Sequence, residues 1–544
     1  MNQAVFRFDV PVNENLFSYG PGCAERTALQ AELRRQSENP IEIPLIIGGK
    51  EVRTGRTGTV VMPHDHRHVL ATYHKAGPDE TRAAIEASLK AKAAWMDLSW
   101  IERTSIMLRA AELLSKKYRY LINAATMLGQ GKSVYQAEID AAAEVIDYLR
   151  FNAYFASCIY SGQPLPGGDC INRMEYRPLE GFVLAVTPFN FTAIALNLNT
   201  APAVMGNVTV WKPASTALLS NYYLMKIYKE AGLPDGVINF LPGPGSAIGG
   251  AALAHRDFAG LHFTGSNSTF NGLWRSVGEN LERYRSYPRL VGETGGKDFV
   301  MVHASADADE VATALVRGAF EYQGQKCSAA SRAYIPRSLW PQVKERLVAW
   351  TEELSMGDVA DFDNFVNAVI DEASFDTLSS HIDRARLAPE AEIIAGGQYD
   401  KSRGYFVRPT VIRTDDPHFV TMEEELFGPV LTVYVYEDGD YEKTLELCDG
   451  TSPYALTGAV FAHDRYAAQL ACRKLRYAAG NFYINDKPTG AVVGQQPFGG
   501  SRGSGTNDKA GSALNLMRWL SPRTIKENLL PPTHYRYPFM DGDI

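Results

Sequence analysis

One cysteine and one glutamate stand in short runs of small residues and could act together on a carbonyl carbon. Cys327 lies in the run GQKCSA at 324–329, and Glu293 lies 34 residues upstream (327 minus 293) in ETGGKD at 293–298. A thiol becomes a nucleophile when a base or a cationic setting removes its proton, and a carboxylate can accept a proton or activate water. The pair predicts covalent catalysis, although a lone free cysteine is more often an inert buried residue.

Polar residues and glycines that follow apolar runs could bind an oxyanion or the ribose and phosphates of a nucleotide. Asn190, in TPFNF at 187–191, could donate its amide to a developing oxyanion, although it could equally complete a turn. Lys212 could hold a ribose or be a solvated charge. The GxGxxG fingerprint is absent, but GPG at 243–245 and GS at 265–266 could present backbone N–H groups to a pyrophosphate. Most such loops are plain turns, so none of these signals is decisive alone.

Two groups of carboxylates each allow two interpretations. The run EEELFGP at 423–429 either forms a solvated face or buries Glu425 beside a ligand. Asp140, Glu144 and Asp147 stand at i, i+4 and i+7, so they share one face of the helix expected over 133–155. We interpret Asp140 and Asp147 as a solvated acidic stripe.

The composition limits the class of protein. The chain has 544 residues, 45% hydrophobic and 21% charged, which predicts a globular protein of two or three domains. A net charge of -8 gives no basic field for nucleic acid. Six cysteines without CxxC spacing favour a reduced, intracellular protein without a disulfide framework, and we expect no metal site.

The most apolar region and the N-terminus give no membrane or targeting signal. Residues 181–211 are interrupted by Pro and Asn, so a membrane span is not expected. The N-terminus has neither the pattern of a secretory signal nor that of an organellar one. We therefore expect a cytoplasmic protein, or one in the mitochondrial matrix if the chain is a mature eukaryotic form.

Strands and helices alternate along most of the chain. Helices are expected over 79–95, 101–117 and 133–155, and from Gly181 onward each buried strand is followed by a helix. This rhythm predicts a parallel sheet with a nucleotide-binding domain, and a second α/β stretch begins near Phe299. A Gly/Pro-rich break at 161–168 predicts a small excursion, and the Pro/Tyr-rich tail from Leu529 looks like a docking arm.

Together these elements resemble the aldehyde dehydrogenase superfamily. Cys327 looks like its nucleophile, Glu293 like its general base and Asn190 like its oxyanion donor, in the family's order and at its spacings. The resemblance implies an α/β protein with a Rossmann-type NAD-binding domain (1–155 and 176–299), an α/β catalytic domain (300–505) and a small β oligomerisation arm with a tail (156–175 and 506–544). It also implies a homodimer or higher homo-oligomer.

The same resemblance implies a cofactor site for NAD. Ser215 stands where many members have a Glu that would repel a 2′-phosphate, so NADP remains a weaker alternative. The residues implied to contact the cofactor are Thr187, Lys212, Ser215, Gly243, Gly265, Ser266, Glu425 and Phe427.

Within the superfamily, the chain is most similar to the enzymes that oxidise L-glutamate gamma-semialdehyde, the second step of proline catabolism. The most specific stretches are 129–153, 286–298 and 481–510. The resemblance implies a substrate site in which a loop at 490–491 donates to the substrate carboxylate. The residues implied for this site are Glu144, Phe191, Lys326, Ser328, Gly490, Ala491 and Phe498.

Two competing interpretations and one partner stay open. A dehydrogenase for succinate semialdehyde would keep every catalytic residue but not the 481–510 loop. A non-enzymatic scaffold would be expected to lose Cys327 or Glu293, and both are present. A proline dehydrogenase partner that passes on the intermediate is compatible with the sequence.

Overall fold

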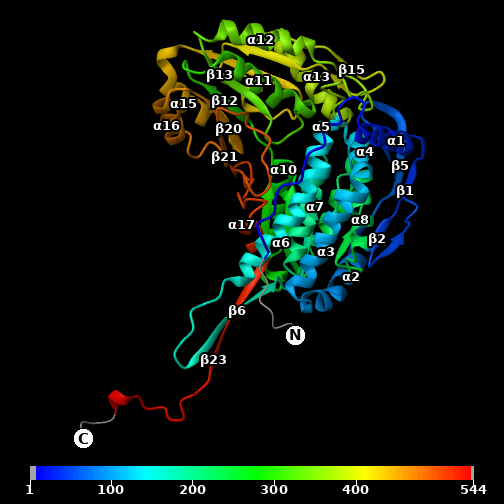
Figure 1. The fold of residues 1–544 in the computed structure, drawn as a ribbon, viewed down its shortest axis with the longest axis vertical. Coiled ribbons are helices and arrows are strands. Elements are labelled where there is room, and N and C mark those ends of the chain that lie inside the picture. The colour runs from blue at the N-terminus through cyan, green and yellow to red at the C-terminus, as the bar shows by residue number, and fades with distance from the viewer. Residues whose placement is uncertain (1–7, 541–544) are drawn as a thin grey trace.

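The described residues, 8–540, form two α/β bodies in a computed structural model, each built around its own seven-stranded sheet (Figure 1). The first sheet has the order β11-β10-β7-β8-β9-β2-β3. The five strands from β11 to β9 in this order are parallel, because a helix connects each of them to the next one along the chain. The strands are β2 (Leu45–Ile47), β3 (Lys50–Val52), β7 (Phe182–Val186), β8 (Thr209–Lys212), β9 (Ile238–Phe240), β10 (Phe258–Thr264) and β11 (Arg289–Glu293).

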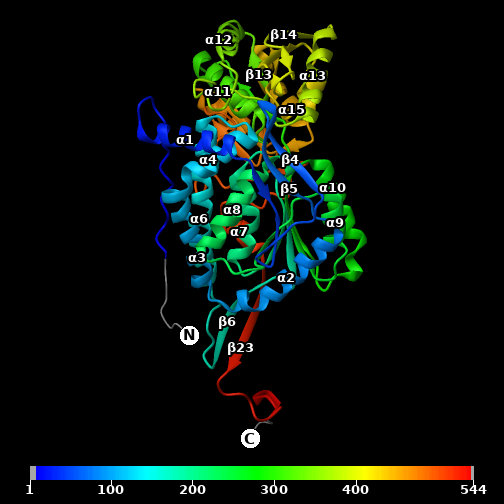
Figure 2. The same ribbon diagram turned by 90° about the vertical axis from the view of Figure 1, so that its right-hand side faces the viewer.

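Helices cover both faces of this first sheet (Figure 2). Strand β10 is buried along its whole length, as expected for a parallel strand between two helical layers. One layer contains α7 (Thr192–Val204) and α8 (Leu218–Ala231), with α3 (Trp100–Leu113), α4 (Arg119–Gln130) and α6 (Val145–Ser161) outside them. The other contains α2 (Pro78–Asp97), α9 (Gly245–Leu253) and α10 (Asn267–Glu279).

The second sheet has the order β14-β17-β18-β13-β12-β20-β21 and is parallel except for β14. Its strands are β12 (Asp298–Val302), β13 (Ala330–Pro336), β14 (Ala391–Ala395), β17 (Thr410–Thr414), β18 (Val430–Tyr436), β20 (Thr457–Phe461) and β21 (Asn481–Ile484). The helices packed on it are α11 (Ala308–Phe320), α12 (Trp340–Glu353), α13 (Glu372–Leu387), α15 (Tyr441–Gly450) and α16 (Arg465–Lys474).

A two-stranded antiparallel arm projects from the first body (Figure 1). It pairs β6 (Cys170–Pro178) with β23 (Leu520–Asn528), from Leu520 opposite Pro178 to Asn528 opposite Cys170. A three-stranded sheet, β1 (Ile41–Ile43), β5 (Asp65–His74) and β4 (Thr57–Met62), flanks the first body. The remaining elements include α1 (Ala24–Glu38), α5 (Val134–Ala137), α14 (Val420–Glu423) and α17 (Ala513–Met517).

The predicted alternation of strands and helices after Gly181 is confirmed. The helix expected over 133–155 is present but longer and interrupted: α5 passes through a π-helical turn at Glu138–Glu144 into α6, which ends at Ser161. Among residues 8–540, no helix is both long and apolar enough to cross a membrane.

Candidate active site

Cys327 and Glu293 both border one cavity of about 330 Å³, a volume typical of small-molecule sites. Glu293 ends β11 in the first body, and Cys327 follows α11 in the second. The cavity therefore lies where the two bodies meet. Its wall also contains every residue expected at the substrate end: Glu144, Phe191, Lys326, Ser328, Gly490, Ala491 and Phe498.

A strained turn delivers Cys327 to this cavity. Tyr322 and Gln323 have left-handed φ values of 54° and 53°, which are unfavourable for residues with a side chain. The Tyr322 hydroxyl donates to the Gln130 carbonyl at 3.0 Å, and the Gln323 amide donates to the Gly131 carbonyl at 2.8 Å. These bonds to the end of α4 compensate for the strain and fix the backbone that leads to the cysteine.

Gly295 and Gly296 follow Glu293, and other parts of the chain pass so close to them that a side chain would not fit. A Cβ on Gly296 would lie 2.5 Å from the Cys327 carbonyl oxygen, and one on Gly295 would overlap the Glu425 carboxylate. With glycine present, the Gly296 N–H instead donates to Glu425 Oε1 at 2.9 Å. The ETGGK run thus lets three segments meet: the end of β11, the cysteine turn and the loop after α14.

Burial has the largest effect on the pKa values of Glu293 and Cys327. It raises the pKa of Glu293 to about 8, against an opposing effect of Lys509. Burial also raises the pKa of the Cys327 thiol well above its usual range, and the charge of Glu293 adds to this shift. A carboxyl that titrates close to neutral pH is suited to accept a proton from a thiol or from water.

Asn190 lies directly beside the cysteine turn. Its side chain is buried, and its Nδ2 donates to the Gln325 carbonyl at 3.1 Å. An amide nitrogen carries two protons, so one bond to Gln325 orients the group without using all its donors. Asn190 is not part of the cavity wall formed by described residues, whereas the next residue, Phe191, is.

The substrate end of the cavity contains a buried ion pair and a hydroxyl pair. Lys326 Nζ donates to Glu321 Oε2 at 2.9 Å, and both residues border the cavity. Burial lowers the pKa of Lys326, and Glu321 counteracts that shift. The Ser328 hydroxyl lies 2.8 Å from the Thr489 hydroxyl. A cation and hydroxyl groups therefore border the space next to Cys327.

The residues expected to contact a cofactor gather at the carboxyl edge of the first sheet. Thr187 follows β7, Lys212 ends β8 and Gly243 follows β9. Gly265 and Ser266 follow β10, and Ser266 caps α10 by accepting from the Thr269 N–H. Open parallel sheets bind ligands at this edge. Ser215 opens a 3-10 turn after β8, and Glu425 with Phe427 comes from the second body.

Lys212 and Gly243 have features that suit a ligand at this edge. Burial alone lowers the pKa of Lys212, and its side chain lies near Gly245 at the start of α9. Gly243 has φ of 151°, and a Cβ there would lie 2.9 Å from the backbone of Ala76. A mostly buried cation beside a helix N-terminus is a suitable contact for a ribose or a phosphate.

A sequence model described as the aldehyde dehydrogenase family matches residues 51–525. The chain belongs to the aldehyde dehydrogenase family. It is 56% identical over 533 residues to the mitochondrial delta-1-pyrroline-5-carboxylate dehydrogenase of Dictyostelium discoideum, covering 97% of this chain and 96% of the relative. It is 51% identical over 540 residues to the delta-1-pyrroline-5-carboxylate dehydrogenase of Agaricus bisporus, covering 98% of this chain and 98% of the relative.

Solved structures agree with this assignment to the aldehyde dehydrogenases. The delta-pyrroline-5-carboxylate dehydrogenase of Mycobacterium tuberculosis bound with NAD aligns with a TM-score of 0.96 at 52% identity, covering 99% of this chain and 100% of that one. A Thermus 1-pyrroline-5-carboxylate dehydrogenase with bound NAD aligns with a TM-score of 0.90 at 33% identity, covering 96% and 100%. The predicted fold class is confirmed by these alignments.

The interpretation of Asp140 and Asp147 as a solvated stripe is wrong for this aldehyde dehydrogenase. Asp140 is 0% exposed, forms an ion pair with Lys132 at 2.6 Å and accepts from the Ala193 N–H at the start of α7. Asp147 is 3% exposed and accepts from Asn13. Both carboxylates have partners supplied from outside their own helix, which periodicity cannot reveal.

Several residues of the cavity wall were not predicted from the sequence. Tyr148 lies four residues after Glu144, so their shared helix face was an available signal. Residues near the N-terminus, far from any recognised motif, also border the cavity, and nothing in their composition indicated it. The unpredicted residues include Asn13, Glu14, Leu16, Tyr148, Lys487 and Thr489.

Proposed function

We propose that this aldehyde dehydrogenase oxidises L-glutamate gamma-semialdehyde to L-glutamate with NAD. The observation that carries the proposal is the cavity in which a thiol, a carboxyl of raised pKa and the 490–491 backbone surround one space with Lys326 and Ser328. An aldehyde with a carboxylate and an ammonium needs such donors and acceptors at its far end. Close relatives named delta-1-pyrroline-5-carboxylate dehydrogenase support this substrate.

The chemistry begins with removal of the Cys327 proton, and Glu293 borders the same cavity as a base. The thiolate forms a C–S bond to the aldehyde carbon, and the carbonyl electrons move to oxygen. The Asn190 amide and the Cys327 backbone N–H stabilise this oxyanion. Loss of hydride from the carbon restores the carbonyl and leaves a thioester. After the proton of the thiol has passed from Glu293 to solvent, Glu293 takes a proton from water, and the resulting hydroxide attacks the thioester, expels the Cys327 thiolate and releases glutamate.

The residues at the carboxyl edge of the first sheet fit a dinucleotide. When bound, NAD supplies the hydride acceptor for the reaction. Lys212 and Ser215 would contact the adenosine ribose, Gly243, Gly265 and Ser266 the pyrophosphate, and Glu425 and Phe427 the nicotinamide ribose. Solved relatives with NAD bound favour NAD over NADP.

The proposed function is tested by NADH formation with delta-1-pyrroline-5-carboxylate, the cyclic form of the substrate. Wild-type enzyme should produce NADH and stoichiometric glutamate. Absence of turnover under conditions in which another aldehyde is oxidised would reject this substrate.

We further propose the domain division and assembly expected from the sequence. The first sheet would belong to an NAD-binding domain (1–155 and 176–299) and the second to a catalytic domain (300–505). The projecting arm, with exposed Leu165 and Ile171, would pair with a second copy to form at least a homodimer. Sedimentation of an arm-deleted variant tests this assembly.

For location and partners, we propose a cytoplasmic enzyme supplied by a proline-oxidising enzyme. Relatives named as mitochondrial make the matrix the alternative for a eukaryotic form. The alignment with proline utilization A of Bdellovibrio bacteriovorus, where this chain covers 54% of that protein, supports the link to proline oxidation. Cell fractionation and co-purification test these two points.

A further inference from the structure

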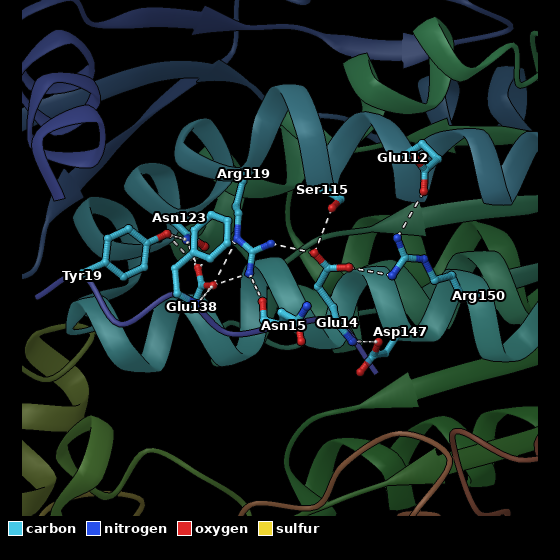
Figure 3. A network of polar contacts seen from close by, with 11 residues as sticks. Glu14, Asn15, Tyr19, Glu112, Ser115, Arg119, Asn123, Glu138, Asp147 and Arg150 are labelled. Atoms are coloured by element: carbon cyan, nitrogen blue, oxygen red, sulfur yellow. Dashed lines mark hydrogen bonds and ion pairs between the residues drawn. The ribbon is translucent and has the colours of Figure 1, made fainter. Parts of the chain in front are cut away.

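Residues 8–23, the described part of the chain before α1, run over the helices of the first body without joining a sheet (Figures 1 and 2). We call residues 13–19 the N-terminal strap. Side chains of α4, the π-helical turn and α6 hold it in place (Figure 3). Its residues Asn13, Glu14 and Leu16 border the catalytic cavity. The strap is therefore part of the site and not only a leader to α1.

Charged side chains hold the strap at Glu14. The Glu14 carboxylate accepts from Arg119 at 2.7 Å, from Arg150 at 2.6 Å and from Ser115 at 2.8 Å (Figure 3). Burial would raise the pKa of Glu14, but these hydrogen bonds lower it below its usual range. Arg119 also pairs with the buried Glu138. Glu14 is thus held as a carboxylate in one position.

The far end of the strap is held by the same network. The Glu138 carboxylate accepts from the Phe17 N–H and from the Tyr19 hydroxyl, each at 2.8 Å. The Arg119 guanidinium lies 3.8 Å from the centre of the Phe17 ring. The strap therefore has rigid contacts on the C-terminal side of Asn13.

Asn13 connects this fixed strap to the loop that borders the substrate end. Its Nδ2 donates to the Val493 carbonyl at 2.9 Å and to Asp147 Oδ2 at 2.7 Å. Its Oδ1 accepts from Gln495 Nε2 at 2.9 Å. We call residues 490–496 the anchor loop. One side chain therefore joins the strap, helix α6 and two points of the anchor loop.

The anchor loop depends on such contacts because it has no sheet of its own. It follows β21 and contains Gly490 and Gly494, which have φ of 99° and 82°. A Cβ on Gly494 would lie 2.2 Å from the Phe151 ring, so the loop lies directly on α6. Within the loop, the Val492 N–H donates to Gln496 Oε1 at 2.9 Å. Asn13 adds two hydrogen bonds from outside the loop, to Val493 and Gln495.

We propose that Asn13 is a positioning residue for the anchor loop and thereby determines the selectivity for an aldehyde with an amino acid head group. The proposal rests on the proposed function. Asn13 fixes the Val493 carbonyl and the Gln495 side chain, and so the backbone of Gly490 and Ala491 in the cavity wall. A short aldehyde without a head group does not reach these donors, so its oxidation does not depend on Asn13.

The test compares Asn13→Ala with Asn15→Ala. Asn15 is an exposed Asn of the same strap, outside the cavity wall of the described residues, and only its backbone carbonyl accepts from Arg119. Loss of the two hydrogen bonds to the anchor loop should raise KM for glutamate gamma-semialdehyde about tenfold with little change in kcat. Neither variant should change kcat/KM for propanal, and Asn15→Ala should match the wild type with both aldehydes.

Hydrogen exchange of the free enzyme gives a readout that needs no substrate. Amides of residues 490–496 should exchange faster in Asn13→Ala than in Asn15→Ala. Gln495→Ala, a substitution of an exposed residue that does not threaten folding, should give part of the same KM increase. The double variant should then lose less than the sum of the two single effects.

Two results would overturn the proposal. One is that Asn13→Ala and Asn15→Ala have the same KM for the semialdehyde and the same exchange in the anchor loop. The other is that Asn13→Ala weakens propanal oxidation equally, which would indicate a general effect on folding. Failure of the proposed function would appear separately, as poor use of the semialdehyde by the wild-type enzyme, with the exchange comparison still deciding the role of Asn13.

Discussion

Two groups of residues lie around Cys327, one proposed to bind the cofactor and one proposed to bind the substrate. The fold positions these two groups, called here the two sides of Cys327, in different ways. On the proposed cofactor side, Thr187, Lys212 and Gly243 each lie at the end of a parallel strand or within three residues of it, so their positions follow from local strand–helix turns. On the substrate side, contacts join distant segments, as when Asn13 bonds to Asp147, 134 residues away, and to Val493, 480 residues away. The cofactor edge is a property of the sheet, whereas the substrate end depends on tertiary contacts between buried charges and loops.

Removal of the nucleophile should have the largest effect, because Cys327 serves both sides. Cys327→Ala should lower kcat for NADH formation at least about 10⁴-fold. Cys158→Ala, at an exposed cysteine, is the matched control and should retain full activity. An alanine variant at 327 that keeps its rate would disprove covalent catalysis by this residue.

Removal of the base should have the next largest effect. Glu293→Gln should lower kcat by about 10³-fold, the range for loss of general acid–base catalysis. In the wild type, the rate should rise as pH increases through about 8, where Glu293 loses its proton, because only the carboxylate can act as a base. The pH–rate profile of Glu293→Gln should lack this rise. An unchanged profile would assign the titration to another group.

Asn190, the proposed oxyanion donor, follows β7 of the first sheet and contacts the cysteine turn through Gln325. Asn190→Ala should lower kcat about a hundredfold, because one preorganised donor to the oxyanion is lost, while KM for NAD stays constant. Steady-state kinetics with both substrates varied measure this. A large change in KM for NAD with normal kcat would instead place Asn190 in cofactor binding.

A substitution on the cofactor side should act on cofactor binding alone. Lys212→Ala should raise KM for NAD about tenfold, the loss expected for one hydrogen bond to a charged group, and leave KM for the aldehyde unchanged. Lys226→Ala, at an exposed lysine of α8, is the control. If Lys212→Ala and Lys226→Ala behave alike, Lys212 does not contact the cofactor.

The difference between the two sides also explains what could be predicted from the sequence. Strand–helix alternation predicted the sheet whose carboxyl edge includes Lys212 and Gly243, because local propensity sets these turns. The assignment of these two residues to a cofactor came from the family resemblance. Asp140 was misinterpreted because its partner Lys132 comes from the loop after another helix, α4. The strap residues Asn13 and Glu14 carry no motif, and only the folded structure brings them to the cavity.

The ratio of kcat/KM for glutamate gamma-semialdehyde to that for acetaldehyde tests the account most directly. A cavity built to bind an amino acid head group should favour the semialdehyde at least about a hundredfold, because the shorter aldehyde has no carboxylate or ammonium to form hydrogen bonds with the groups of this cavity. Equal efficiency for the two aldehydes would contradict the account, since the groups around Lys326, Ser328 and the anchor loop would then contribute nothing to substrate selection.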